Sequence, residues 1–305
     1  MIDFVGKKHW FFLFSAVALI IATISLAAFR LQPGIDFTGG TSMTLRFTPR
    51  VEQSRLREEL VNLEHPEAVI QGSGDDFFIR LKELSTEERG DLTGGLETSL
   101  GSTVTALDYS TVSPSIATET ARNAGIAVVI ASVAMLFYIA WAFRRMPNPF
   151  RWGTCAIVAL IHNVLIVAGL FAILGKAIGV EVDALFITGL LTIVGYSINN
   201  TVVVFDRVRE NVSKVVSPDF AATVNISLVE TLVRSLNTSL TTLCVILALL
   251  FFGGATIHYF ILVLFVGLVA GTYTSMCIAG PLLVVWEKGE WRQLLQWYWF
   301  RKRPA

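Results

Sequence analysis

The sequence contains few charged residues for its length. Aspartate, glutamate, lysine and arginine make up 16% of its 305 residues, whereas about a quarter of a soluble domain is usually charged. Hydrophobic residues make up 53% and the mean hydropathy is +0.62, which excludes an ordinary soluble domain. The 24 basic and 24 acidic residues cancel, so bulk charge does not predict nucleic acid as a partner.

The sequence also lacks the residue patterns of most catalytic and metal sites. It has three cysteines, and their spacing is too wide for a zinc site. It contains no nucleophile–base pair, metal-ligand cluster or phosphate-binding Walker loop. We therefore expect a protein that is not an enzyme and that holds neither a cofactor nor a metal ion.

Several apolar runs are long enough to cross the hydrocarbon core of a bilayer, which is about 30 Å thick. The first run follows Lys7 and Lys8 and is too long for the apolar core of a signal peptide. We therefore predict a multi-pass membrane protein that retains its first helix. The predicted spans are residues 10–29, 123–143, 153–174, 184–205, 237–252 and 259–286.

Basic residues gather on one side of these spans, and this side is cytoplasmic by the positive-inside rule. Both termini are therefore expected in the cytoplasm and residues 31–122 outside it. The tail, residues 287–305, combines basic residues with aromatic ones and suits the inner membrane interface. Residues 217–234 are amphipathic and are expected to lie along that surface and continue into the fifth span. The basic residues are Lys7, Lys8, Arg144, Arg145, Arg151, Arg207, Arg209, Lys214, Lys288, Arg292, Arg301, Lys302 and Arg303.

Residues 31–122 form the one long hydrophilic segment, and its patterns alternate between strand and helix. Ser85 and Glu88 form a capping-box pattern at the start of the second helix, which its glycines weaken. The order strand, helix, strand, strand, helix, strand is typical of a ferredoxin-like domain. The strands are predicted at 42–47, 68–71, 77–81 and 103–112, and the helices at 51–63 and 85–100.

The predicted fold class is a membrane all-α bundle of six transmembrane helices with one extracytoplasmic ferredoxin-like α+β domain. The predicted domains are residues 1–30 with the first span, the α+β domain at 31–122, the remaining bundle at 123–286 and the tail at 287–305.

Residues 190–211, LLTIVGYSINNTVVVFDRVREN, place polar side chains in the middle of an apolar span. A polar group in hydrocarbon has an unfavourable transfer free energy unless it faces protein or water. Tyr196 and Asn200 are four residues apart and share one face of the helix. In the fifth span, Arg234, Thr238 and Thr241 follow one stripe.

Two interpretations of these polar residues remain open. In the first, Arg234 reaches the cytoplasmic headgroups while hydroxyl and amide groups hold neighbouring helices together. In the second, the residues form a polar path through the bundle in which Arg234 faces Asn200.

Two further groups carry the same ambiguity. His162 and Asn163 lie near the middle of the third span, where the histidine is either a hydrogen-bonded structural residue or a titratable, water-organising one. Asp206 lies beside Arg207 and Arg209 at the inner end of the fourth span. These charges are either an interfacial anchor suited to a helix C-terminus or a gating network of ion pairs.

Residues 34–41, GIDFTGGT, contain the motif residues Gly34, Asp36, Gly39 and Gly40. The glycines precede a strand rather than a helix, which disfavours a phosphate site. We predict a structural turn where the outer domain leaves the membrane.

Four motifs in order resemble those of the SecF members of the SecD/SecF family, membrane proteins of bacterial Sec-dependent protein export. They are GIDFTGGT, VSPSI at residues 112–116, GYSINNTVVVFDRVREN at 195–211 and TLVRSLNTSLTTL at 231–243. The resemblance covers nearly the whole chain. It implies a resistance–nodulation–division type fold in the bacterial cell (inner) membrane, forming half of a pseudo-symmetric bundle with a SecD-like subunit. It also implies that the complex joins the SecYEG channel, assists translocating preproteins and draws on the proton-motive force.

The sequence departs from the family at two positions. The family usually has aspartate where Asn200 and Asn163 stand, and an amide carries no proton at physiological pH. Arg234 matches the family's membrane arginine. We therefore hypothesise that this subunit's own proton site is silent and that proton coupling rests on the SecD-like partner. The alternatives are a passive scaffold for SecD and the translocon, or half of a proton-driven exporter of lipids or small molecules; the coupling ion stays open.

Overall fold

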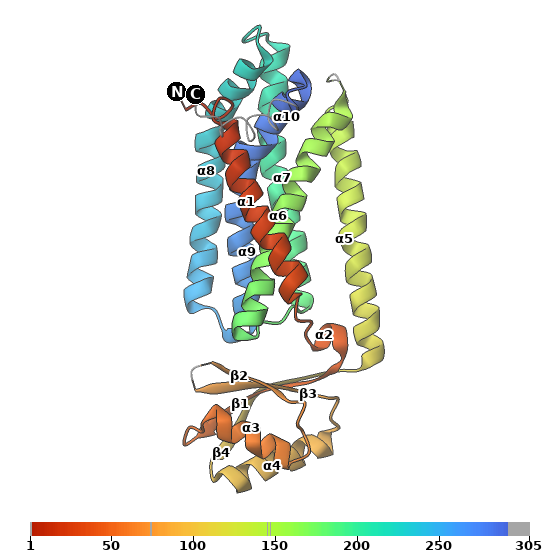
Figure 1. Cartoon of the computed structure of the whole chain (residues 1–305), viewed down its shortest axis with the longest axis vertical. Coiled ribbons are helices and arrows are strands. Elements are labelled where there is room, and N and C mark those ends of the chain that lie inside the picture. The colour runs from red at the N-terminus through yellow and green to blue at the C-terminus, as the bar shows by residue number, and fades with distance from the viewer. Residues whose placement is uncertain (1, 74, 145, 147, 292–305) are drawn as a thin grey trace, which may run out of the picture. The chain divides into compact units, whose positions relative to one another are not determined.

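The computed structural model describes residues 2–73, 75–144, 146 and 148–291, which fall into two units (Figure 1). The helical unit comprises Met1–Arg30, Ala127–Ile173 and Leu185–Ala305, and the α/β unit comprises Leu31–Ile126 and Leu174–Ala184. The predicted interfacial aromatic residues of the tail are Trp291, Trp297, Tyr298 and Trp299, of which the last three lie outside the described residues. The same holds for the basic residues Arg145, Arg292, Arg301, Lys302 and Arg303.

Six helical stretches in the described residues are long and apolar enough to cross a membrane. The first five are α1 (Lys8–Phe29), α5 (Pro114–Ala142), α6 (Pro149–Ile178), α7 (Ala184–Ser213) and α8 (Phe220–Phe252). The sixth consists of α9 (Ala255–Thr274), a π-helical turn η1 (Ser275–Ala279) and α10 (Gly280–Lys288).

The π-helical turn η1 directly precedes Pro281 in α10. Proline lacks an N–H group, and its ring clashes with the carbonyl group four residues earlier in a regular α-helix. A wider turn at this point accommodates the proline without ending the span, and such turns are frequent at functional sites.

The amphipathic segment 217–234 runs directly into the fifth span, because residues from Phe220 onward form the first turns of α8. The carboxylate of Asp219 caps this helix and accepts hydrogen bonds from the backbone N–H groups of Ala221 and Ala222. No glycine or proline interrupts the sequence from Phe220 to Phe252, so one helix of 33 residues results.

The α/β unit contains a short helix α2 (Ile35–Thr38) followed by four strands and two helices. These are β1 (Gly40–Thr48), α3 (Gln53–Asn62), β2 (Val69–Ser73), β3 (Asp76–Leu81), α4 (Thr86–Leu100) and β4 (Thr103–Val112). The strand order is β2-β3-β1-β4 and all pairs are antiparallel. Figure 1 shows α3 and α4 on one face of the sheet. The predicted capping box is present at Ser85 and Glu88.

This arrangement confirms the predicted fold class of six membrane helices with a ferredoxin-like α+β domain. The core of the α/β unit lies between the sheet and α3 and α4. It is formed mainly by Met43, Leu45 and Phe47 of β1, Leu56 and Leu60 of α3, Phe77, Ile79 and Leu81 of β3, and Leu92, Leu96 and Leu100 of α4.

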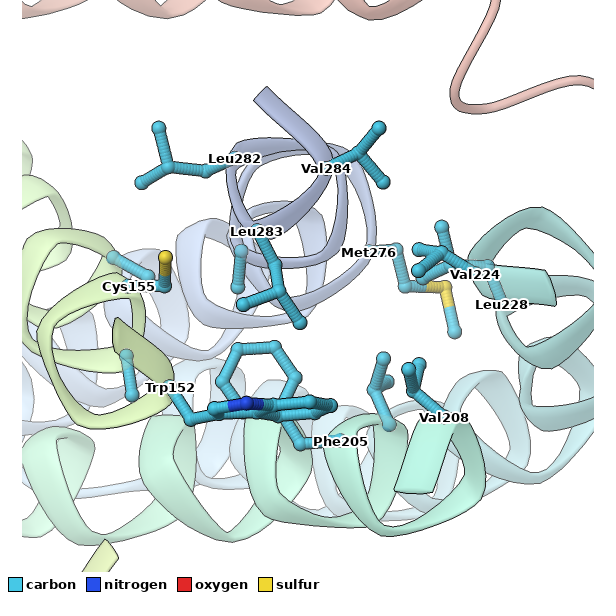
Figure 2. Packing of buried hydrophobic residues seen from close by; sticks show 14 of the residues in the cluster. Trp152, Cys155, Phe205, Val208, Val224, Leu228, Met276, Leu282, Leu283 and Val284 are labelled. Atoms are coloured by element: carbon cyan, nitrogen blue, oxygen red, sulfur yellow. The ribbon is translucent and has the colours of Figure 1, made fainter. Parts of the chain in front are cut away.

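The core of the helical unit is centred on aromatic rings from α6 and α7. The Trp152 and Phe205 rings meet edge to face, with centroids 5.3 Å apart. Figure 2 shows Leu283 of α10 pointing toward these rings and Met276 of η1 pointing toward Leu228 of α8. Packing of this kind fixes α6, α7, α8 and the sixth span against one another, so polar groups on their facing sides are held at defined distances.

Candidate functional site

The polar residues of α7 point into the helical unit. Ser197, Asn200 and Thr201 are buried, together with apolar residues on the same face of the helix. Asn199 and Asp206 lie on the exposed face. One face of α7 therefore builds an internal polar cluster while another carries polar groups to the surface of this unit.

Asn163 of α6 lies at the centre of the buried cluster and is only 1% exposed. Its side-chain N–H group donates to the Ser197 hydroxyl group at 2.7 Å. Its carbonyl oxygen accepts from the Thr274 hydroxyl group at 3.0 Å, and it lies 3.3 Å from Nδ1 of His162. One amide thus connects α6 to α7 and to the end of α9.

The cluster continues through Thr201 and Ser275. Their hydroxyl groups are 3.0 Å apart, and Ser275 donates to the carbonyl oxygen of Gly271 at 2.8 Å. A Cβ atom on Gly271 would lie 3.3 Å from that of Ser197, so glycine allows the two helices to approach. Because Ser275 begins the π-helical turn, the irregular backbone and the polar cluster coincide.

A second, smaller polar group joins α7, α8 and α9. The Tyr196 hydroxyl group donates to Ser239 at 3.3 Å, and the Thr272 hydroxyl group donates to the same oxygen at 2.8 Å. Tyr196 is therefore tied to α8, whereas Asn200, one turn later, is not.

In the part of the chain that the structure describes, Nε2 of His162, Nδ2 of Asn200 and Oγ of Ser235 are buried and have no hydrogen-bond partner. They lie on α6, α7 and α8 respectively. Buried polar atoms nearly always have a partner, so these atoms mark places where the helical unit can accommodate a further polar group.

A charged cavity of about 420 Å³ lies between the basic end of α7 and the first half of α8. Asp206, Arg207, Glu210, Glu230, Thr231 and Arg234 line it. Most of these charges are paired: Arg207 donates to Glu230 at 2.7 Å and to Glu210 at 2.6 Å, and Asp206 pairs with Arg209. Arg234 is exposed, and its side chain has no hydrogen bond or ion pair to another described residue.

The two interpretations of the stripe on α8 differ in whether Arg234 faces Asn200. No hydrogen bond joins them among the described residues, and Arg234 lines the cavity with Asp206 rather than with Asn200. The described hydrogen bonds between α7 and α8 run instead from Tyr196 to Ser239, from Arg207 to Glu230 and from Asn211 to Ser227 and Glu230.

Among the described residues, the hydroxyl groups of Thr238 and Thr241 also make no hydrogen bond to another helix. Both are exposed, and their hydroxyl groups bond to carbonyl oxygens of α8 itself, including that of Arg234. With Asn237 they extend the stripe that begins at Arg234.

Sequence reasoning missed the contribution of the sixth span. Thr272, Thr274 and Ser275 supply hydroxyl groups to both polar groups. The available signal was the run GTYTS at residues 271–275 within an apolar span, six residues before Pro281.

The motif residues Gly34, Asp36, Gly39 and Gly40 belong to the α/β unit. Gly34 precedes α2, Asp36 lies within it, and Gly39 and Gly40 follow it with φ angles of 77° and 125°. A Cβ atom on Gly40 would lie 2.5 Å from the carbonyl oxygen of Leu81, so only glycine fits where α2 turns into β1.

The apolar parts of the six long helices contain no carboxylate: residues 10–29, 127–143, 153–174, 185–205, 235–252 and 257–286 lack aspartate and glutamate. In the described residues, no group of three or more histidine, cysteine, aspartate or glutamate side chains is arranged to hold a metal ion. The buried cluster consists of amide and hydroxyl groups, which organise hydrogen bonds without carrying a charge, and of the imidazole group of His162.

Comparison with known proteins identifies the family to which these features belong. The family described as "Protein export membrane protein SecD/SecF, C-terminal" matches residues 95–289, and the "SecD/SecF GG Motif" matches residues 24–49. The chain belongs to the SecD/SecF family. The protein translocase subunit SecF of Thermobaculum terrenum is 42% identical over 97% of both chains, and that of Anaerolinea thermophila is 40% identical over 100% of this chain and 99% of its own.

Solved SecDF structures have the same fold. The crystal structure of SecDF from Thermus thermophilus, described as a translocon-associated membrane protein, is 39% identical with a TM-score of 0.85. The match covers 94% of this chain and 39% of that one. A SecDF structure in a Super-membrane-facing form has a TM-score of 0.67. In SecDF relatives, the region similar to this chain is fused to a SecD part, so a SecD-type partner is indicated for this multi-pass SecF-type subunit.

Proposed function

We propose that this SecF-type subunit of the Sec protein translocation machinery assists preprotein export together with a SecD-like subunit and the SecYEG channel. The proton-motive force supplies the energy: one charge crossing 100 mV releases about 2.3 kcal/mol. The whole-length similarity to SecF subunits supports this role.

In the proposed orientation both termini lie in the cytoplasm and residues 31–122 lie outside. The support for this is the clustering of basic residues at one end of the spans, including Lys7, Lys8, Arg207 and Arg209, which the positive-inside rule assigns to the cytoplasm.

Arg234 is the observation that carries the mechanism. Its guanidinium group is exposed on this subunit and unpaired among the described residues, and the apolar parts of the six long helices offer it no carboxylate. An unpaired charge at the end of a membrane span is stabilised by the headgroups or by a partner of opposite charge. We therefore assign the stripe of Arg234, Asn237, Thr238 and Thr241 to the face that meets the SecD-like partner, whose membrane carboxylate pairs with Arg234 and binds the proton.

Under this proposal the subunit's own proton site is silent. Asn163 and Asn200 occupy buried positions of the cluster, and neither amide takes up a proton. The cluster then acts as a fixed hydrogen-bonded support for α7, and the stripe on α8 provides the positive side of the proton site.

The test uses the complete complex with SecYEG in proteoliposomes and measures how much an imposed proton gradient increases preprotein export. Arg234→Ala is expected to abolish this increase while the SecD-like partner still copurifies. Val233→Ala, at an exposed neighbouring position on α8, is the matched control and is expected to retain it. An Arg234→Ala complex that assembles and keeps the full increase would favour a passive scaffold instead.

The proposal that this subunit has no proton site of its own is tested in a complex whose SecD-like partner lacks its membrane carboxylate. The wild-type subunit is expected to show no gradient-dependent increase in that complex. The combination of Asn163→Asp and Asn200→Asp is expected to restore part of the increase and a proton current. Gradient dependence that persists with the wild-type subunit would contradict the silent site.

A further inference from the structure

The loop between α6 and α7 is held against the start of the α/β unit. The backbone N–H group of Gly34 donates to the carbonyl oxygen of Val182, and that of Val182 donates to Gln32, both at 2.8 Å. Pro33 and Val182 form a parallel β-bridge. A Cβ atom on Gly34 would lie 3.2 Å from the oxygen of Val182, so glycine permits this close approach.

Side chains of the sheet hold the same loop. Arg80 of β3 donates to the carbonyl oxygen of Pro33 at 2.7 Å and pairs with Glu181 at 3.0 Å. Gln71 of β2 donates to the carbonyl oxygen of Gly179. The Glu181 side chain is only 12% exposed, so the attraction between the two charges is weakly screened by solvent and is opposed by the desolvation of the carboxylate.

The GG motif also touches the first residues of two membrane helices. The carboxylate of Asp36 accepts a hydrogen bond of 2.8 Å from the N–H group of Ala184, the first residue of α7. A negative charge at a helix N-terminus is stabilising there. A Cβ atom on Gly39 would lie 3.0 Å from Cα of Pro114, the first residue of α5.

We call the set Gly34, Asp36, Arg80 and Gly179–Ala184 the clasp. All of its members lie in the α/β unit. From Ala184 the chain continues without a break into α7, the helix that carries Ser197, Asn200 and Thr201. In contrast, α1 ends at Phe29 and joins the α/β unit through Arg30, which is not helical and has a φ angle of 58°.

We infer that the clasp is the mechanical connection through which movement of the α/β unit and movement of α7 drive each other. Asp36 is its positioning residue, because it fixes the first turn of α7 to the GG motif. Arg80 and Glu181 keep the loop on the sheet, so α7 cannot shift along its axis without displacing β3. The GG motif thus serves force transmission in addition to forming a turn. This inference rests on the proposed function.

The first experiment lengthens the chain inside the clasp, directly before Ala184, the first residue of α7. Two glycines inserted after Asp183 are expected to abolish the gradient-dependent increase in export, while the partner still copurifies and the amides of β1 and β3 keep their protection from hydrogen exchange. The same insertion after Pro66, in the turn between α3 and β2, is the matched control and is expected to retain the increase.

A second variant decides the matter if the insertion after Asp183 prevents assembly. In a background with Cys155, Cys244 and Cys277 replaced by alanine, the pair Pro33→Cys and Val182→Cys forms a disulfide that locks the clasp. Full export in the oxidised state is expected, because the clasp stays closed throughout the cycle. Loss of export on oxidation, with recovery on reduction, would overturn the inference.

The two proposals fail in distinguishable ways. If wild-type complexes export no better with a proton gradient than complexes lacking this subunit, the proposed function fails. If the wild type shows the increase and the insertion after Asp183 shows it at full size, the clasp inference alone fails.

Discussion

The side-chain amide of Asn163 in α6 donates a hydrogen bond of 2.7 Å to the hydroxyl group of Ser197 in α7. Its carbonyl oxygen accepts from Thr274, so Asn163 donates on one side and accepts on the other. A protonated carboxylic acid has the same pattern. The amide therefore holds the three helices permanently in the arrangement that a carboxyl group would support only in its protonated form.

Replacing this amide by an apolar group of similar size is expected to loosen the bundle. Asn163→Leu leaves the Ser197 hydroxyl group buried without its partner, which costs about 1–3 kcal/mol of unfolding free energy. Thermal unfolding in detergent measures this loss. Thr192→Val is the matched control, because the Thr192 hydroxyl group bonds only to its own helix. Equal stability of Asn163→Leu and the control would show that the amide does not hold the helices together.

The α/β unit is expected to show two opposite pH dependences. Burial raises the pKa of the Glu181 carboxyl group, Arg80 opposes this rise, and Asp183 adds to it. The pKa of Glu181 is higher in the folded state than its unfolded-state pKa of 4.5. The stability that Glu181 contributes is therefore present below pH 4.5 and is lost as the pH rises through the folded-state pKa. The stability of the wild type relative to Glu181→Gln is therefore expected to fall as the pH rises.

Asp76 supplies the control of opposite sign. Its hydrogen bond with Arg46 lowers the pKa of the Asp76 carboxyl group. The stability it contributes is present above the unfolded value of 3.8 and is lost as the pH falls through the folded pKa. The stability of the wild type and of both variants is measured at each pH from hydrogen exchange of the β1 and β3 amides, corrected for intrinsic exchange rates. If the stability difference between wild type and variant changed with pH in the same direction for Glu181→Gln and Asp76→Asn, the predicted opposite pKa shifts would be contradicted.

Local patterns in the sequence were sufficient to predict the four strands, the helices α3 and α4 and the six spans, but not the short helix α2 or the π-helical turn η1. The strand at 103–112 and the helix capped by Ser85 follow from alternation and capping, which depend on neighbouring residues. The pairing of Gly34 with Val182 joins residues far apart in the sequence and leaves no such periodic signal.

The candidate site was predictable only in part. A polar residue within an apolar span is visible in the sequence, and this pattern identifies Asn163, Tyr196 and Asn200 as candidate site residues. Which helix each one faces depends on the rotation of packed helices about their axes. For this reason the partners of Asn163 and the position of Arg234 beside Asp206 required the structure.

Glycine substitutions in the α/β unit are expected to act in opposite directions. Gly40→Ala places a Cβ atom 2.5 Å from the carbonyl oxygen of Leu81 at a φ angle of 125°, so a loss of more than about 1 kcal/mol is expected. Gly90→Ala lies in α4 with no atom within 4 Å of the added Cβ, and a gain of about 0.5–1 kcal/mol is expected. Chemical denaturation, monitored by hydrogen exchange of the sheet amides, measures the stability of both variants. A Gly40→Ala variant as stable as the wild type would mean that the turn relaxes freely.

The N-terminal residues are expected to detach from the bundle when Asn225 of α8 is shortened. Its carbonyl oxygen accepts from the N–H groups of Phe4 at 2.8 Å and Val5 at 3.3 Å, and its N–H group donates to Ile2. Asn225→Ala removes these hydrogen bonds at a cost of about 1–3 kcal/mol, although Phe4 and Val5 remain packed in the apolar core.

Faster hydrogen exchange of residues 2–8 at an unchanged unfolding temperature of the bundle is the expected result, because the affected contacts lie at the end of the chain. Asn237→Ala is the matched control, since Asn237 is an exposed asparagine of the same helix. If Asn225→Ala leaves exchange of residues 2–8 at the control rate, then packing of Phe4 and Val5 holds the segment and the amide does not.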